Sequence, residues 1–389
     1  MKRETGVLLL LGAAHSLNHS LFLVLPPLLE DISRDLGASF QTLGLVTTVA
    51  FLLYGLGALV GGPLSDRMGH VRIARVSIGL AGVSTLVFLL PSSLVVFGAG
   101  LWAIASWASF YHPTANTLIA KLYTEYTARS MGIHGASASV GQMLTPTVAY
   151  LIGTAFHWRY AFVFFGAASM ATSLLMRRIP PVQDPARAER TPLLEILRVP
   201  GLWVLIFYNV VIGLFQRGVE LFFPTFLTVE RGFPGRLAAL FNSLLLLIGV
   251  AGQLMGGWAS DRYSSKRFLV VASLGMVVSM LFLLLLPFRS AGVVAFVVLY
   301  GLFFFGHQPT MTSLLGSVSP MDLMGMAYGV MFFFAFGLGS VSTTISGYLA
   351  DNFSLEAVFW IMALFSFMTL VISLVIPRVV KDRASGNKQ

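Results

Sequence analysis

A chain of 389 residues that is 56% hydrophobic and only 11% charged does not have the composition of a soluble globular protein, in which roughly 25% of residues are charged. Because the chain contains no cysteine, disulfides, thiolate metal sites and cysteine nucleophiles are excluded. The formal net charge of +9 would suggest nucleic acid in a soluble chain, but we expect no such partner here, because the positions of the charges matter more than their sum.

Apolar stretches of about twenty residues recur along the chain, and each is long enough to cross a hydrocarbon core of ~30 Å. Polar residues interrupt the first stretch and no small-residue cleavage site follows it, so we expect a spanning helix rather than a removed signal. The sequence therefore predicts an all-α polytopic membrane protein with about twelve transmembrane helices. The predicted spans are 6–29, 40–63, 71–91, 94–118, 130–155, 158–177, 199–228, 236–258, 267–287, 291–317, 322–348 and 355–377.

Lysine and arginine are distributed unevenly between the two sides of these spans. An even number of spans places both termini on one side, and cytoplasmic loops carry the excess of cations. The side opposite the termini holds five: Arg34, Arg159, Arg231, Arg236 and Arg289. The side of the termini holds nineteen: Lys2, Arg3, Arg67, Arg72, Arg75, Lys121, Arg129, Arg177, Arg178, Arg187, Arg190, Arg198, Arg262, Lys266, Arg267, Arg378, Lys381, Arg383 and Lys388. We therefore predict that both termini are cytoplasmic.

The longest polar stretch, RRIPPVQDPARAERTPLLEILR, runs from Arg177 to Arg198 and falls at the midpoint of the chain. It is rich in proline and charge, which is typical of a linker. We expect an N-terminal six-helix bundle at 1–177, a cytoplasmic linker at 178–198, a C-terminal six-helix bundle at 199–377 and a cytoplasmic tail at 378–389.

The two halves repeat each other. GGPLSDRMGHVR at Gly61–Arg72 returns as GGWASDRYSSKR at Gly256–Arg267, and Tyr111-His112-Pro113-Thr114 is echoed by His307-Gln308-Pro309-Thr310. The spacings Gly57-x-x-x-Gly61 and Gly252-x-x-x-Gly256 also predict faces that allow close helix approach. A duplicated membrane protein of this kind is typical of transporters that work by alternating access.

The segment after the second span resembles the signature of the major facilitator superfamily, G-x-L-x-D-R-x-G-R-[RK]. Gly62, Leu64, Asp66, Arg67 and Gly69 fit it, whereas His70 and Val71 depart from it. The resemblance implies two pseudo-symmetric six-helix bundles and a gating latch once per half, formed by Asp66, Arg67, Arg72, Asp261 and Arg262. The simpler alternative is that Asp66 and Arg67 only cap and orient a loop.

Ionisable residues at membrane depth are costly and mark functional sites. They fall on the first, fourth, seventh and tenth spans, which line the central cavity in the family that the sequence resembles. These residues are His15, His19, His112, Arg217, Glu220 and His307.

His15 and His19 share a helix face with Asn18 beside it, and they could bind substrate, relay protons, ligate a metal or fix helix packing. The Arg217 guanidinium suits carboxylate, phosphate or phosphonate, and Glu220, the isolated intramembrane acid, is the first candidate for a coupling proton. A permanent ion pair is the alternative for these two residues.

His112 lies beside Pro113 and His307 lies near Pro309, so each is expected beside a helix kink. His134 is expected near the cytoplasmic gate. The predicted proton-coupling residues are Glu220, His19 and His112, and no resident metal or cofactor is expected. The predicted substrate-binding residues are His15, Asn18, His19, Tyr111, His112, Arg217, His307 and Gln308.

A narrower resemblance is to the fosmidomycin-resistance group of bacterial efflux proteins. It rests on His15-x-x-Asn18, Leu25-Pro26-Pro27-Leu28 and Phe110-Tyr111-His112-Pro113. His19 and Thr114 stand where that group has acids. Gly141-x-x-x-x-Pro146 resembles a degraded antiporter motif, which favours export.

The sequence thus predicts a monomeric secondary transporter in a bacterial inner membrane, exporting a small polar or anionic organic compound or drug in exchange for protons. No phosphate-binding G-x-x-x-x-G-K-[ST] loop is present, so ATP is not the energy source within this chain. The alternatives are an importer of a metabolite anion and a divalent-metal exporter that uses the intramembrane histidines. A membrane-embedded enzyme or a non-transporting receptor is less consistent with the duplicated latch, so we do not expect an enzyme.

Overall fold

The computed structural model describes residues 2–123, 127–180, 201–286, 289–319 and 324–376, and the structural statements below concern these residues. Every regular element among them is a helix, which confirms the predicted fold class. The predicted tail, and all but the first three residues of the predicted linker, lie outside the described residues.

The first half of the chain forms six spans that alternate in direction. The first span ends at Leu23 rather than at the predicted residue 29, because Pro26 and Pro27 cannot donate the backbone hydrogen bonds that would continue it. The elements are α1 (Lys2–Leu23), η1 (Pro26–Leu28), α2 (Leu29–Leu36), α3 (Phe40–Met68), α4 (His70–Ser84) with η2 (Thr85–Leu89), α5 (Leu94–Ala108) with α6 (Tyr111–Leu122), α7 (Thr127–Ala155), and α8 (Trp158–Leu175) with η3 (Met176–Arg178).

The second half repeats this arrangement with six further spans. One of them contains a π-helical segment, η4, in its middle. The elements are α10 (Leu202–Val229), α11 (Gly235–Arg262), α12 (Ser265–Leu285), α13 (Arg289–Val318), then α14 (Met324–Phe332), η4 (Phe333–Gly337), η5 (Leu338–Ser340) and α15 (Val341–Asn352) as one span, and α16 (Leu355–Val375). We call the side where α1 begins and α16 ends the terminal side, and the other side the opposite side.

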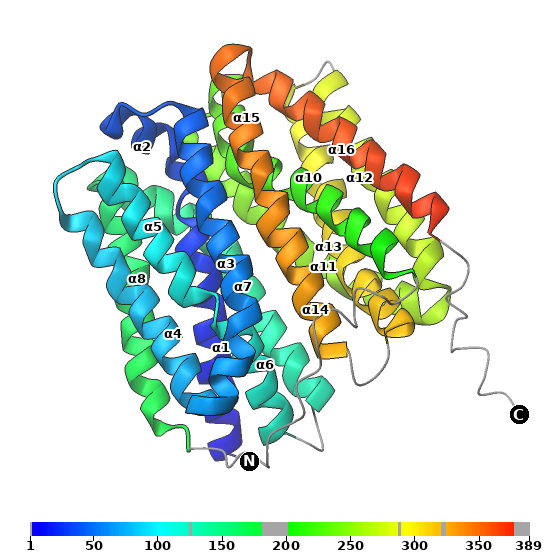
Figure 1. Cartoon of the computed structure of the whole chain (residues 1–389). Coiled ribbons are helices and arrows are strands. Elements are labelled where there is room, and N and C mark those ends of the chain that lie inside the picture. Colours follow the sequence, from blue (N-terminus) through cyan, green and yellow to red (C-terminus); the bar gives the residue numbers. More distant parts are fainter. Residues whose placement is uncertain (1, 124–126, 181–200, 287–288, 320–323, 377–389) are drawn as a thin grey trace, which may run out of the picture.

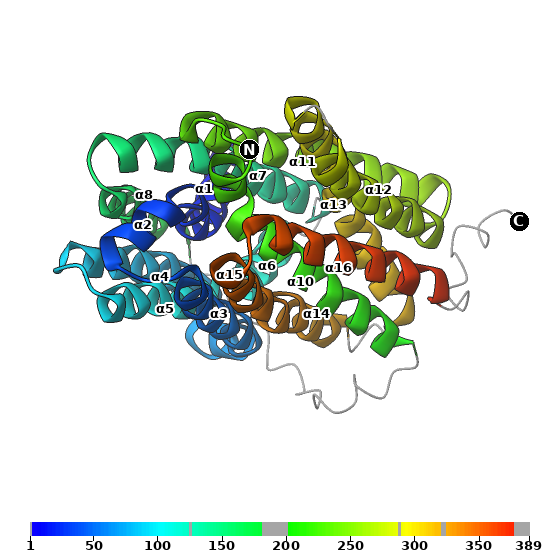
Figure 2. The same ribbon diagram turned by 90° about the horizontal axis from the view of Figure 1, so that it is seen from above.

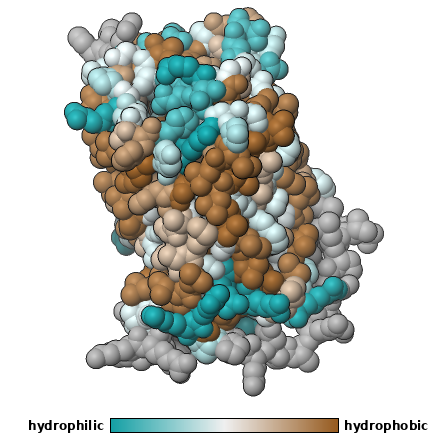
Figure 3. Space-filling model, turned by 90° about the vertical axis from the view of Figure 1, so that its left-hand side faces the viewer, coloured by the Kyte–Doolittle hydropathy of each residue, from teal (hydrophilic) through white to brown (hydrophobic). Residues whose placement is uncertain are grey.

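The surface has the pattern of a membrane protein. Eleven helical segments of the described residues are long and apolar enough to cross a membrane. Helix α7, with 29 residues, is also long enough, but its Ser, Thr, Gln and His residues make it less apolar than these eleven. Figure 3 shows a hydrophobic band between two ends where hydrophilic residues gather. Charged side chains avoid the band because hydrocarbon cannot solvate them.

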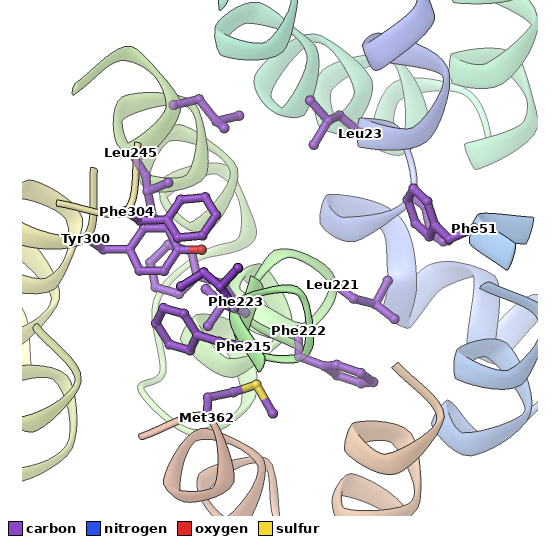
Figure 4. Packing of buried hydrophobic residues seen from close by; sticks show 14 of the residues in the cluster. Leu23, Phe51, Phe215, Leu221, Phe222, Phe223, Leu245, Tyr300, Phe304 and Met362 are labelled. Atoms are coloured by element: carbon purple, nitrogen blue, oxygen red, sulfur yellow. The ribbon is translucent and has the colours of Figure 1, made fainter. Parts of the chain in front are cut away.

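The helices form two bundles that meet along a central seam. In Figures 1 and 2, α4, α5 and α8 lie on one flank and α12, α13 and α16 on the other, with α1, α3, α7, α10, α11 and α15 between them. Helix α10 is buried over most of its length by neighbouring helices, and Figure 4 shows Phe215, Phe222 and Phe223 pointing from it to different neighbours. Its main interruption is the pair Arg217 and Glu220.

The glycine spacings in the two repeats serve close helix approach, as predicted. A Cβ at Gly61 would lie 3.0 Å from the Cα of Phe110, and a Cβ at Gly252 would lie 2.5 Å from the Gly301 carbonyl oxygen on α13. These positions let backbones pack directly, which is the main source of helix association in lipid.

The prediction that the second span ends at residue 63 was wrong, because the signature segment is helical. Helix α3 continues through Asp66 and Arg67 to Met68 and ends where Gly69 takes a φ of +89°, a value that glycine adopts at little cost. In the second half α11 likewise extends to Arg262 rather than ending at residue 258. The carboxylate of Asp66 lies 3.3 Å from His70 Nε2 at the start of α4.

The bundles are held together on the opposite side. Helix α3 packs against α15, where Thr343 Oγ1 donates to the Gly44 carbonyl at 2.8 Å and Thr48 Oγ1 donates to the Ser340 carbonyl at 2.8 Å. The Asp351 carboxylate accepts hydrogen bonds from the first two backbone N–H groups of α3 at 3.0 and 2.7 Å. Helices α7 and α11 also meet there, with Thr147 and Ser243 hydroxyls 2.8 Å apart. The structure is therefore closed on the opposite side.

This closed contact predicts the effect of one added methyl group. A Cβ at Gly44 would collide with the Thr343 carbonyl oxygen, so Gly44→Ala is expected to shift the bundles toward opening on the opposite side. The measurement is the distance between spin labels on α3 and α15 at that side. Gly62→Ala on the same helix is the matched control, because a Cβ there meets nothing within 4 Å. Equal distance distributions in both variants would contradict the prediction.

Candidate functional site

A cavity of about 790 Å³ lies between the bundles and extends from the middle of the seam toward the terminal side. Both bundles contribute to its wall, through α1, α3, α6 and α7 on one side and α10, α11, α13 and the α14–η4 span on the other. Its polar lining residues include His15, His19, Tyr54, Asn116, Gln142, Asn209, Gln216, Arg217, Glu220, Asn242, Gln253, His307 and Gln308.

Arg217 is the buried cation of this cavity, with 3% of the residue exposed. Its guanidinium carbon lies 4.0 Å from the centre of the Phe51 ring and 4.6 Å from that of Phe336. Phe51 belongs to the first bundle and Phe336 to η4 in the second, so one ring from each bundle packs on the cation. Its Nη1 donates to Glu220 Oε2 at 2.7 Å, and its Nε has no hydrogen-bond partner among the described residues.

Glu220 lies one helical turn from Arg217 and remains accessible. Its side chain is 25% exposed and lines the cavity, and it also accepts a long hydrogen bond of 3.5 Å from Gln216 Nε2. Only one guanidinium nitrogen therefore binds the carboxylate, which leaves other donors of Arg217 for an anion.

Four histidines gather beside the cavity in the first bundle. The rings of His15 and His134 stack with centroids 4.1 Å apart, and the His112 centroid lies 4.8 Å from that of His15 and 5.2 Å from that of His19. His15 Nδ1 donates to the His134 carbonyl at 3.0 Å, so His134 is tied to this cluster within the membrane span rather than to the terminal surface.

Asn18 and Tyr111, two predicted substrate contacts, lie behind the cavity wall. Asn18 donates to the Ala108 carbonyl at 2.8 Å and accepts from the Tyr54 hydroxyl at 2.7 Å. Tyr111 donates to the Leu11 carbonyl at 2.5 Å, and its oxygen is 3.2 Å from His134 Nε2. Neither residue is exposed, so their contacts fit helix packing.

The two predicted kinks differ. The fourth span breaks between α5 and α6, just before His112 and Pro113, whereas α13 continues through Pro309 without a break. His307 and Gln308 both line the cavity. His307 Nδ1 donates to the Phe304 carbonyl, and Gln308 Oε1 accepts from Gln253 at 3.2 Å.

The predicted gating residues lie away from the cavity, at the terminal ends of their helices. All five are exposed: Asp66, Arg67, Arg72, Asp261 and Arg262. Arg262 lies over the Trp258 ring at 6.0 Å. Their gating role stays a prediction.

Several cavity residues were not predicted from the sequence. Phe51 and Phe336 are two of 32 phenylalanines, and no spacing distinguishes them from packing residues. The sequence analysis did not single out Tyr54, Gln216 or Gln253 either. The two glutamines could have been predicted, because a side-chain amide inside an apolar span is a signal of a functional site.

Comparison with known proteins decides the family. The model of the Major Facilitator Superfamily matches residues 8–344, which is most of the chain. The chain belongs to the Major Facilitator Superfamily. A crystal structure of a bacterial homolog of the human lysosomal transporter Spinster, inward-facing and occupied, shares this facilitator fold with a TM-score of 0.81, 15% identity and coverage of 97% of each chain.

Two curated relatives of this facilitator are named for different kinds of substrate. The probable sulfoacetate transporter of Cupriavidus necator is 27% identical over 355 residues, covering 82% of this chain and 81% of that protein. Multidrug resistance protein D of Escherichia coli strain K12 is 25% identical over 366 residues, covering 90% of this chain and 89% of that protein. The narrower resemblance to the fosmidomycin-resistance group is not confirmed by these comparisons and stays a prediction.

Proposed function

We propose that this facilitator moves a small organic anion together with a proton, as in the importer alternative, with Arg217 as the anion anchor and Glu220 as the proton carrier. The observation that supports it is a nearly buried guanidinium at the seam between the bundles, whose Nη1 binds the cavity-lining Glu220 carboxylate and whose Nε has no hydrogen-bond partner among the described residues. A guanidinium offers a planar fork that matches carboxylate, sulfonate and phosphate oxygens.

The anion class also draws support from the relative named for sulfoacetate, a compound that carries a carboxylate and a sulfonate. An anion with two charged groups could meet Arg217 at one end and the imidazoles of His15, His19 or His307 at the other, since all of them line the same cavity. Its apolar part would contact Phe51, Phe336 and the other aromatic side chains of the wall.

Coupling follows from competition for one cation. When an anion binds Arg217, Glu220 loses its partner, and an unpaired carboxylate in an apolar site gains a proton to avoid the cost of a bare charge. When the proton leaves, Glu220 can reclaim Arg217 and displace the anion. Anion and proton therefore bind and leave this site together, which couples their movement in the same direction across the membrane.

Orientation is part of the proposal. The excess of lysine and arginine at the ends of the helices on the terminal side favours a cytoplasmic location for both termini, in a bacterial inner membrane. The cavity then opens toward the cytoplasm, where an importer releases its substrate. We retain the bundle boundaries 1–177 and 199–377 with the linker 178–198 between them, and a monomer as the working unit.

The test is flux in proteoliposomes of the purified full chain. Sulfoacetate, a dicarboxylate, a phosphonate and a cationic drug are loaded in turn, and transport is followed with an imposed pH gradient and after a protonophore collapses it. Anion movement that is driven by protons moving in the same direction supports the proposal. Anion movement against the protons would favour the proton-driven exporter predicted from the sequence, and flux of the drug alone would overturn the anion anchor.

A further inference from the structure

We propose that His15, His19 and His112 form a binding site for a divalent transition-metal ion, with Zn²⁺ as its representative. The site is distinct from the Arg217–Glu220 pair and goes beyond the proposed anion transport, of which no step depends on the ion. One ligating nitrogen from each of the three side chains lies within 4.8 Å of the other two. The side chains come from α1 and α6, two helices of the same bundle.

The orientation of His15 prepares it as a ligand. Its Nδ1–H donates to the backbone carbonyl of His134 at 3.0 Å, and a carbonyl can only accept. In a neutral imidazole the lone pair is then on Nε2, directed away from that carbonyl. A hydrogen bond from the second ring nitrogen to a carbonyl is the usual support of a metal-bound histidine. The stacked His134 ring, 4.1 Å away, holds the His15 ring plane.

The nitrogen separations suit tetrahedral coordination. His19 Nε2 lies 3.3 Å from His15 Nε2, and two ligands of a tetrahedral zinc ion at ~2.0–2.1 Å are about 3.3 Å apart. Without a metal, one of these two facing nitrogens must carry a hydrogen for the other to accept. With a metal, both can present lone pairs once His19 shifts its hydrogen to Nδ1.

His112 supplies the third ligand. Its Nε2 is buried and has no hydrogen-bond partner among the described residues, although buried ring nitrogens are normally satisfied. Its ring lies edge-on to His15 with centroids 4.8 Å apart, so a modest rotation of the side chain brings a nitrogen into the coordination shell. A metal would satisfy this orphaned atom.

Three imidazoles leave one position of a tetrahedral ion open, as in three-histidine sites that keep a water or substrate as the fourth ligand. His15 and His19 line the cavity, so this open position faces it. A water, chloride or the oxygen of an anion can fill it and offset part of the positive charge. Neutral nitrogen ligands favour Zn²⁺, Ni²⁺, Co²⁺ and Cu²⁺ over Mg²⁺ and Ca²⁺.

The experiment uses the full chain in detergent, purified without a polyhistidine tag. Zinc affinity and stoichiometry are measured by isothermal titration calorimetry, and Co²⁺ is added in parallel to read the geometry from its visible absorption. We expect one equivalent of Zn²⁺ and a tetrahedral Co²⁺ spectrum for the native chain. His112→Ala and His19→Asn should each weaken zinc at least about tenfold, since even a lost supporting partner of a ligand costs 10–100-fold.

His307→Ala is the matched control, because His307 is also a buried, cavity-lining imidazole but lies in the other bundle. It should bind zinc with native affinity. Size-exclusion profiles and thermal unfolding without metal check that each variant is folded, and His19→Asn covers the case in which His112→Ala does not fold. Absent zinc binding in the native chain, undiminished binding in a folded cluster variant, or equal loss in His307→Ala would overturn the site. Zinc binding can be absent from the native chain while its anion flux is intact, so failure here is distinct from failure of the proposed function.

Discussion

Replacing Arg217 with lysine is expected to weaken binding of the transported anion by roughly 10–100-fold, the cost of losing one charge-assisted hydrogen bond of ~1.5–3 kcal/mol. The ammonium keeps the charge but loses the planar fork that binds two oxygens together. It also loses the flat surface that packs between Phe51 and Phe336. The measurement is substrate affinity by counterflow in proteoliposomes, supported by ligand-induced shifts in thermal unfolding.

Arg231→Lys is the matched control for this prediction. Arg231 also lies over a phenylalanine ring, that of Phe226 at 4.7 Å, and donates to the Leu283 carbonyl at 3.0 Å, but it is outside the cavity lining. We expect it to leave anion affinity unchanged. Unchanged affinity in Arg217→Lys as well would mean that Arg217 and Glu220 are a permanent structural ion pair.

Replacing Glu220 with glutamine is expected to uncouple anion movement from the pH gradient. The amide cannot take up the transported proton, and it no longer holds Arg217 as a charge partner at 2.7 Å. Anion exchange across the membrane should therefore continue, and anion affinity should not fall, while a pH gradient should no longer drive accumulation. The measurement is accumulation and counterflow in the same proteoliposomes over a range of external pH.

Glu356→Gln provides the comparison for the carboxylate. Glu356 lies in the first turn of α16 on the opposite side and does not line the cavity. Its variant should keep the native response to the gradient. Accumulation that still follows the gradient in Glu220→Gln would exclude Glu220 as the proton carrier.

The fold was largely predictable because hydrocarbon imposes strong constraints on sequence. Span length and the Asp66/Asp261 repeat predicted the twelve spans in two bundles, and the same cost of charge in lipid led to His15, His19, Arg217 and His307, which all line the cavity. Helix ends were less predictable. A polar run such as Ser-Asp-Arg is typical of a loop, yet here it belongs to α3, which continues to Met68.

The detailed wall of the site was not predictable. Asn18 and His15 are three residues apart on one helix, but the helix is oriented about its axis so that Asn18 contacts Ala108 and Tyr54 while His15 faces the cavity. The sequence alone does not predict this orientation, because apolar residues occur on every side of the helix. For the same reason the two rings that enclose Arg217 could not be chosen among the many phenylalanines.

The enclosure of Arg217 has a consequence for how an empty carrier behaves. Phe51 and Phe336 approach the guanidinium from different bundles, and Phe336 lies in the π-helical segment η4, an irregularity that is frequent at functional sites. Any rearrangement that parts α3 from η4 must take one ring off the cation and forfeit ~0.5–2 kcal/mol of attraction. Under the proposed function, an anion bound at Arg217 would compensate for that loss, whereas an unloaded site would not. Proton leak without substrate would then be opposed by the side chain that we propose as the anion anchor.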